Sequence, residues 1–298
     1  MRTLQLTTIV LSTLFAVACN GDKSDSAVGE GEGEGEGEGE GEGEGEGEGE
    51  GEGEGEGEGE GEGEGEGEGE GEGEGEGTGA VRLAHFGVFP GDADTEVDIF
   101  VGGAPSGITF GFKQTTPFVD LPAGSYDFDI VPAGGGVEDS VFPIPGFGLA
   151  EGDQWSVFAA GYLSPPEGGN AFNVFAIPEN RSDIPAGNVR VQVVHAAALG
   201  ALDPVDVWVV DGDCAPSTEI LADFAFGSYA AVDLATTEVN VGFDIGGDDT
   251  VDACFKIPDV GVSDDIVSVY AVNDDAGNVS LVAHLPDGTP AEIPPSEF

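Results

Sequence analysis

The chain has 298 residues and a formal net charge of −53, with 60 Asp and Glu residues against 7 Lys and Arg residues. This excess of negative charge argues against nucleic acid and anionic lipid headgroups as binding partners. The chain has three cysteines, and without further cysteines or well-placed histidines we expect no zinc site on them.

Residues 1–18 have the pattern of an export signal. Arg2 precedes an apolar run from Leu4 to Ala18, which is shorter than the roughly 20 residues that span a bilayer. The run ends in Ala16-Val17-Ala18-Cys19, which resembles the lipobox of bacterial lipoproteins and predicts a lipid on Cys19. The same small residues fit ordinary signal peptidase, so plain secretion is the alternative.

The mature N-terminus, residues 19–28, begins with Cys19-Asn20. An Asn after the cysteine, in place of Asp, resembles the sorting signal of outer-membrane lipoproteins in Gram-negative bacteria. We therefore expect an outer-membrane lipoprotein exposed at the cell surface. An orientation toward the periplasm is the alternative.

Residues 29–77 alternate strictly between Gly and Glu and contain 24 glutamates. No apolar side chain offsets the entropy cost of ordering this segment, so we expect a disordered tether. A neutral Gly-rich coil of this length would span roughly 40 Å, and repulsion between glutamates should extend it. The tract is interpreted either as a stalk or as a passive spacer.

Two copies of one β-rich unit follow, predicted at residues 79–184 and 188–290, with a C-terminal tail at 291–298. Val81-Arg82-Leu83-Ala84-His85 is matched by residues 191–195, and Val97-Asp98-Ile99-Phe100-Val101 is matched by residues 205–209. Alternating apolar residues in these segments indicate strands. About seven short strands per copy predict an all-β protein with two tandem antiparallel β-sandwiches, placed end to end.

Further strands are expected in both copies, bounded by turn residues such as Pro122-Ala123-Gly124. They are 108–111, 118–121, 125–131, 154–162, 172–177, 220–226, 230–234, 238–244, 266–272 and 279–284.

The motifs of the first copy resemble the DUF4397 family. They are the opening Val-Arg-x-x-His, the strand at 97–102, the Phe110-Gly111 element and the segment 121–135. The resemblance covers nearly all of residues 80–290 and implies Ig-like sandwiches, often in tandem, on exported bacterial proteins. It implies no catalytic residue. The second copy departs from the pattern at Gln192, where Arg is usual, and at 235–237.

Cys214 and Cys254 both lie in the second copy, and an exported protein meets an oxidising compartment, so we expect a disulfide between them. His85 and His195 occupy equivalent positions in different copies. They are interpreted as structural side chains that hydrogen-bond a neighbouring loop. His284 ends a late strand and has no evident partner in the sequence.

Asp92, Asp94 and Glu96 alternate ahead of a strand, with a spacing similar to the first ligands of calcium loops. Val97 stands where such a loop needs its turn glycine, and Gly103 stands where it needs its last glutamate. These residues are therefore weak calcium candidates. The acidic segments 246–252 and 263–265 are interpreted as solvated turns or a second acidic cluster.

Phe100 and Trp208 match between the copies and are expected on the strand face opposite the valines. If that face is exposed, the two rings form a binding surface for a glycan or a protein. Packing under an adjacent loop or against the other copy is the alternative.

No motif of a hydrolase, a zinc protease or a nucleotide-binding loop is present in the sequence. We expect no enzyme and no cofactor, but a membrane-anchored surface lipoprotein that acts as an interaction or structural module. Its partners would be the membrane, through the lipid, and an unknown protein or glycan. The alternatives are a calcium-stabilised binding module and, more remotely, a carbohydrate-active enzyme or its accessory domain.

Overall fold

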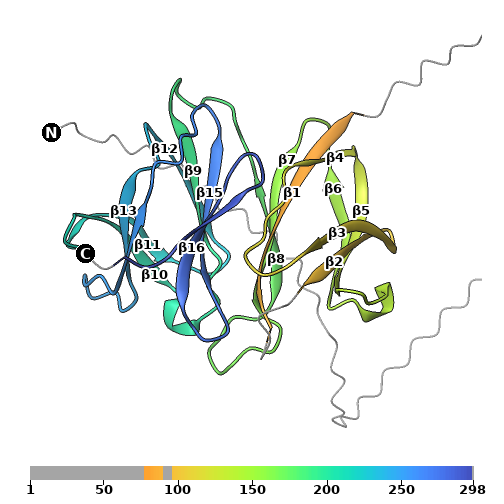
Figure 1. Cartoon of the computed structure of the whole chain (residues 1–298), viewed down its shortest axis with the longest axis horizontal. Helices are drawn as coiled ribbons and strands as arrows, with labels where there is room; N and C mark the ends of the chain where they lie inside the picture. Colours follow the sequence, from red (N-terminus) through yellow and green to blue (C-terminus); the bar gives the residue numbers. More distant parts are fainter. Residues whose placement is uncertain (1–76, 90–95, 297–298) are drawn as a thin grey trace, which may run out of the picture. The chain divides into compact units, whose positions relative to one another are not determined.

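The computed structural model describes residues 77–89 and 96–296, which belong to one compact unit and consist of β-strands, turns and two short 3-10 helices (Figure 1). The first half contains the strands β1 (Thr78–Val88), β2 (Val97–Val101), β3 (Ala104–Phe110), β4 (Val119–Pro122), β5 (Gly124–Pro132), β6 (Phe142–Leu149), β7 (Gln154–Tyr162) and β8 (Asn173–Pro178), with the helix η1 (Val137–Asp139). The second half contains the strands β9 (Val189–His195), β10 (Val205–Val210), β11 (Pro216–Phe224), β12 (Tyr229–Leu234), β13 (Val239–Asp244), β14 (Ala253–Ile257), β15 (Ile266–Asn273), β16 (Val279–His284) and β17 (Pro290–Ile293), with the helix η2 (Gly200–Leu202).

Each half is a sandwich of two sheets. The first pairs the sheet β4-β1-β7-β8 with the sheet β3-β2-β5-β6, and the second pairs β12-β9-β15-β16-β17 with β11-β10-β13-β14. When β9 is taken as the counterpart of β1, the second sandwich repeats the strand order of the first and adds β17. The prediction of an all-β protein with two sandwiches is confirmed.

The predicted antiparallel pairing holds for most neighbouring strands, but each sandwich also contains one parallel pair. β1 runs parallel to β7 from Ala80↔Gln154 to Val88↔Tyr162, and β9 runs parallel to β15. Parallel strands are favoured where both faces of a sheet are buried, and such strands read as nearly continuous apolar runs. β15 has this pattern, since all its residues are buried.

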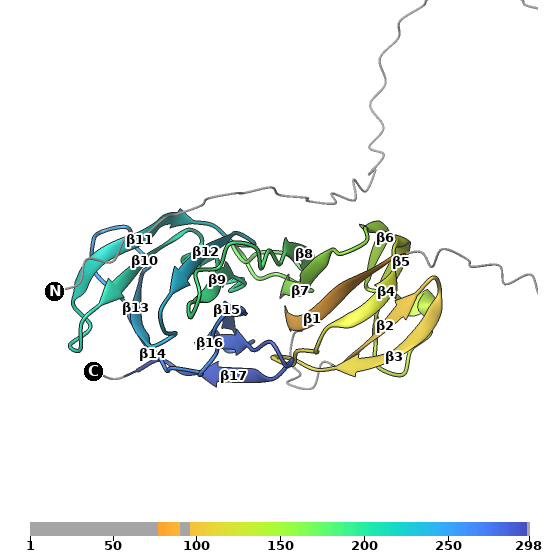
Figure 2. The same cartoon turned by 90° about the horizontal axis from the view of Figure 1, so that it is seen from above.

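The two sandwiches pack face to face, which corrects the expected end-to-end arrangement. A third apolar core lies between the sheet that contains β1 and the sheet that contains β9, so four sheets follow one another (Figure 2). Alternation in the inner strands produces this core: Ala84 and Phe86 of β1 face the other sandwich, while Leu83 faces its own. From the first half it contains Ala84, Phe86, Phe158, Ala160 and Ile177, and from the second half Val194, Ala196, Tyr270, Val272 and Val282.

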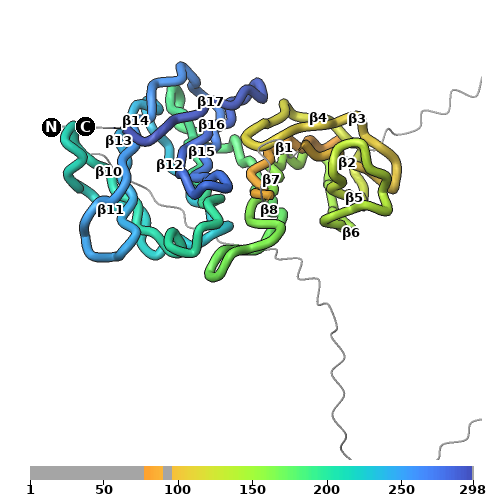
Figure 3. Tube along the Cα trace, turned by 60° about the horizontal axis from the view of Figure 1, so that its bottom comes forward, coloured from red at the N-terminus to blue at the C-terminus, as the bar shows by residue number. Residues whose placement is uncertain are grey.

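The second sandwich extends beyond residue 290, so the expected tail at 291–298 is in part a strand. β17 pairs with β16 at the edge of its sheet, and Ile293 is buried in the core of the sandwich. The chain then crosses to the other sheet, where the Ser296 amide donates to the Cys254 carbonyl at 2.8 Å. The last described residues therefore close one side of this sandwich (Figure 3).

Candidate functional site: the polar core between the sandwiches

The buried side chain of Arg82 is the centre of the contact between the two sandwiches. It projects from β1 with no exposed surface, and its Nε donates to Ser156 Oγ of β7 at 2.8 Å. Its other nitrogens reach the second sandwich, where Nη2 donates to Ser268 Oγ at 3.0 Å and Nη1 donates to the Leu285 carbonyl at 3.2 Å. One guanidinium therefore joins three strands and a turn of both sandwiches.

The charge of Arg82 is balanced by Glu179, the first residue after β8. The two side chains form a fully buried ion pair, and Ser156 Oγ donates to the same carboxylate. Arg181 Nη2 lies 3.2 Å from the other oxygen of Glu179, and its Nε lies 2.7 Å from Asp265 Oδ1 at the start of β15. Positive and negative groups thus alternate across the interface, which offsets part of the cost of burying them.

Aromatic and amide groups surround this ion pair. The guanidinium carbons of Arg82 and Arg181 lie 5.3 and 5.1 Å from the centre of the Phe118 ring, within the range of a cation–π contact. Gln192 on β9 accepts from Ser268 Oγ at 3.0 Å and donates to the Pro178 carbonyl at 3.2 Å. Burial raises the pKa of the Tyr270 phenol, so this ring stays neutral. The arrangement holds two sheets together and leaves its central groups without access to solvent.

All three histidines are buried. His195 Nε2 donates to the carbonyl of Leu202 at 2.6 Å, so the expected bond to a neighbouring loop is confirmed for this residue. His85 Nδ1 accepts from the Gly87 amide at 3.3 Å. His284 has no evident partner in the sequence, and in the structure its Nε2 donates to the Thr116 carbonyl of the other sandwich at 2.9 Å. Sequence alone misses this bond because Thr116 lies far away along the chain.

Burial also determines the charge of two of these rings. It lowers the pKa of His195, and burial together with the nearby Arg82 lowers the pKa of His284 to about 3. Both rings are therefore neutral at neutral pH, and they act as hydrogen-bond donors within the fold.

The calcium candidates are only partly covered by the structure. Asp92 and Asp94 lie outside the described residues, and Glu96 is exposed just before β2. The next acidic residue, Asp98, accepts hydrogen bonds from Thr109 Oγ1 and from the Gly134 amide, and these two bonds lower its pKa. Within residues 77–89 and 96–296, no group of three or more His, Cys, Asp or Glu residues is arranged to hold a metal ion.

Asp244 organises the acidic turn that follows β13, a role that the sequence did not reveal. Burial would raise its pKa, but the amides of residues 246, 247, 248 and 249 donate to its carboxylate and the net result is a lowered pKa. Such a ring of amides favours the ionised carboxylate. Asp264 likewise accepts from the Gly187 amide at 2.7 Å. Asp264 lies in the segment 263–265 and so shapes a turn, as one of the two interpretations predicted, whereas Asp244 lies just before the segment 246–252.

Phe100 is only 7% exposed, so for this ring packing holds and an exposed binding surface does not. The segment after β5 folds over the outer face of this sheet, where Gly135 lies against Val131. Trp208 is half-buried, and its indole nitrogen is buried. It pairs with Gly242, beside which Val210 and Val251 fill the space above the strand. The alternative of packing under a loop agrees with these positions.

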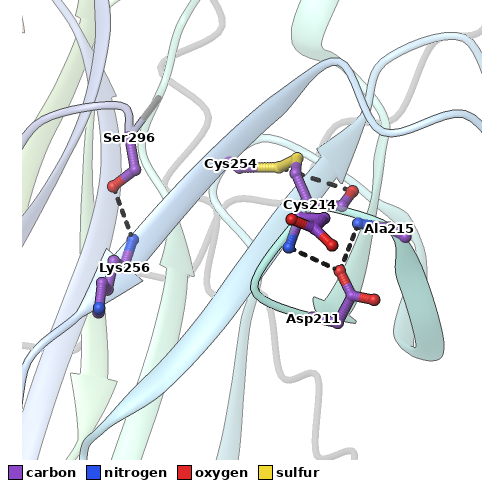
Figure 4. Close-up of a disulfide and its surroundings, with 7 residues drawn as sticks. Asp211, Cys214, Ala215, Cys254, Lys256 and Ser296 are labelled. Carbon is purple, nitrogen blue, oxygen red and sulfur yellow. Dashed lines mark hydrogen bonds between the residues drawn. A yellow bond between two sulfur atoms is a disulfide. The ribbon is translucent and has the colours of Figure 1, made fainter. Parts of the chain in front are cut away.

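Cys214 and Cys254 form a disulfide with a Cα–Cα distance of 6.2 Å (Figure 4). Cys214 lies in the turn between β10 and β11, and Cys254 lies in β14. Asp211 shapes this turn, because its Oδ1 accepts from the amides of Asp213 and Ala215 at 2.9 and 3.0 Å. The disulfide fixes this turn to β14, the edge strand of the outer sheet.

The N-terminal predictions fall on residues that the structure does not describe. Cys19, the signal at 1–18 and the tract up to residue 76 are outside the described part. In the part that is described, no helix is both long enough and apolar enough to cross a membrane.

One family model matches part of the chain. The model of the family described as Domain of unknown function (DUF4397) matches residues 81–207. A DUF4397 domain is found there. The match begins within β1, includes the rest of the first sandwich and ends within β10 of the second, so it includes Arg82, Glu179 and Gln192. No curated protein is detectably similar to the chain.

Proposed function

We propose that this protein is an exported, membrane-anchored lipoprotein whose two DUF4397-like sandwiches form a non-catalytic interaction or structural module at the cell surface. The observation that carries this proposal is the closed polar core around Arg82. Its ionisable groups balance one another and join the two sandwiches. The ionisable groups of this core are buried and pair with one another, whereas the catalytic groups of an enzyme must reach a substrate. A non-catalytic module that presents the two sandwiches as one rigid body therefore fits the core better than an enzyme does.

The N-terminal sequence supports the anchoring part of the proposal. The lipobox-like Ala16-Val17-Ala18-Cys19 provides a lipid attachment site, and Asn20 fits sorting to the outer membrane. Residues 29–77 then provide a long, strongly acidic spacer of alternating Gly and Glu. In this proposal the lipid holds the chain in the membrane, and the spacer lets the sandwiches reach a partner at a distance.

The distribution of charge supports a partner of particular chemistry. Of the five Lys and Arg residues among those described, Arg82, Lys113, Arg181 and Arg190 form ion pairs within the molecule. The surface is therefore dominated by carboxylates. A protein or glycan that presents positive charge complements this surface, whereas nucleic acid does not.

The anchoring is tested by growing producing cells with labelled palmitate and isolating the protein from their membranes. We expect label on the parent protein and none on a Cys19→Ala variant, which should appear in the soluble fraction. Equal solubility of both proteins, with label on neither, would show that the signal is cut by ordinary signal peptidase.

A further inference from the structure

The tether joins the folded part at the first residue of its most extensively bonded strand. The Gly-Glu tract ends at Gly77, and Thr78 begins β1 with no loop between them. β1 pairs in parallel with β7 over nine residue pairs and antiparallel with β4 over four. After Thr78 its residues are buried or nearly so. Any tension on the tether therefore enters the protein at the end of an inner strand.

The same strand is bound to the second sandwich close to the point where the tether enters. Arg82, four residues after Thr78, donates to Ser268 and to the Leu285 carbonyl, and it forms the buried ion pair with Glu179. Two residues further on, Ala84 belongs to the apolar core that both sandwiches share, as does Phe86. A pull on β1 is thus resisted by both sandwiches.

We propose that β1 is a force-transmitting strand, which passes tension from the N-terminal tether to both sandwiches without unfolding. The biological use of this property rests on the proposed membrane anchoring. The physical reason lies in the direction of the load. When β1 is pulled along its axis, its hydrogen bonds to β7 and β4 are loaded together, whereas a strand pulled sideways from one end loses its bonds one after another.

The parallel pairing provides a matched pair of attachment points for testing this idea. Because β1 and β7 run the same way, Tyr162 at the end of β7 pairs with Val88, far from Thr78. Exposed Ser164 lies two residues after Tyr162. The start of β7 lies beside the start of β1, and exposed Glu151 precedes it in a turn where the Gly152 amide donates to the Thr78 carbonyl. Tension between the tether and Ser164 therefore shears the pair, whereas tension between the tether and Glu151 unzips it.

The experiment uses the mature chain from Cys19 to Phe298, purified without a lipid and with its disulfide intact. Cys19 provides the thiol for one DNA handle, and Ser164→Cys or Glu151→Cys provides the other. Each variant is stretched in optical tweezers at one loading rate. Thermal melting without force confirms that each substitution leaves the fold as stable as in the parent.

We expect the mean rupture force of the Ser164→Cys variant to be several-fold higher than that of the Glu151→Cys variant. Equal forces, or a lower force for Ser164→Cys, would overturn the proposal, because β1 would then have no resistance specific to the direction of the tether. If Glu151→Cys lowers the melting temperature, Ala150→Cys in the same turn replaces it.

This test does not depend on acylation. A failure of palmitate labelling would remove the anchoring and leave the directional strength of β1 in place. Equal rupture forces would remove the mechanical role and leave the anchoring in place.

Discussion

Glu179 is the residue on which the contact between the sandwiches depends most directly. Its side chain is fully buried and it balances Arg82, which is fully buried as well. Replacing it by Gln leaves an uncompensated guanidinium in the interface, and removal of one partner of a buried ion pair costs about 3–5 kcal/mol. We expect Glu179→Gln to lower the free energy of unfolding by that amount in urea titrations.

A double variant separates the charge from the packing. Arg82→Gln combined with Glu179→Gln removes both charges at once, so it should recover a large part of the loss. A Glu179→Gln variant as stable as the parent would show that water or another group already compensates Arg82.

His284 makes stability depend on pH in a range where carboxylates contribute little. Its pKa is about 3 in the folded state, because of burial and the nearby Arg82, against an ordinary value of 6.5 in the unfolded chain. Below pH 6.5 the unfolded state therefore binds a proton that the folded state does not, and stability falls as the pH falls toward 3. Between about pH 7 and about pH 4.5, His284 alone should cost about 2–3 kcal/mol.

The control for this pH effect is His284→Gln, whose amide can still donate to the Thr116 carbonyl. We expect a shallower decline of melting temperature over this pH range in the variant, with His195 accounting for part of what remains. Parallel pH profiles for variant and parent would contradict the assignment.

At the scale of the element, the disulfide stabilises the second sandwich. Cys214 and Cys254 are separated by 40 positions, and the chain-entropy model assigns a loop of this length about 4 kcal/mol. We expect the variant with both Cys214→Ser and Cys254→Ser to melt at a clearly lower temperature than the parent. A reductant should lower the melting temperature of the parent to that of the variant and leave the variant unchanged. A loss below about 1 kcal/mol would mean that strain offsets the entropy gain.

The strands show which elements can be predicted from the sequence and which cannot. Gln154–Tyr162 and Val279–His284 have the bounds that alternation and turn residues predict. β6 was not predicted, because Pro143 and Pro145 interrupt the alternation of apolar residues that indicates a strand. Prolines are tolerated in a strand at the edge of a sheet, and β6 lies at such an edge. β14 and β17 were not predicted either, since each is short and β17 begins with Pro290 directly after the turn Pro286-Asp287-Gly288.

The parallel pairing was missed for a different reason. Apolar residues on both faces of β1 and β15 indicate that another layer covers each sheet, but one sequence does not say which layer. The lone basic residue Arg82 in an apolar strand was the available signal that a buried partner exists. Glu179 could not be identified as that partner, because the contact joins residues that are distant along the chain.

At the scale of the whole molecule, the shared core predicts that the two sandwiches unfold together. Apolar residues from both halves fill the third core, and the Arg82–Glu179 pair lies beside it. Exposing that core in one half would remove the support of the other half. We expect one calorimetric transition, with a ratio of calorimetric to van't Hoff enthalpy close to one. Two separate transitions would show that the interface contributes little to stability.

The proposed function requires that the sandwiches be displayed outside the cell on an N-terminal lipid. The most direct measurement is protease shaving of intact producing cells, with antibodies against the folded part and a periplasmic protein as the control for leakage. We expect residues 77–296 to be released from whole cells by cleavage within the N-terminal tract, while the control stays protected. Protection of the sandwiches until the outer membrane is broken would contradict surface display.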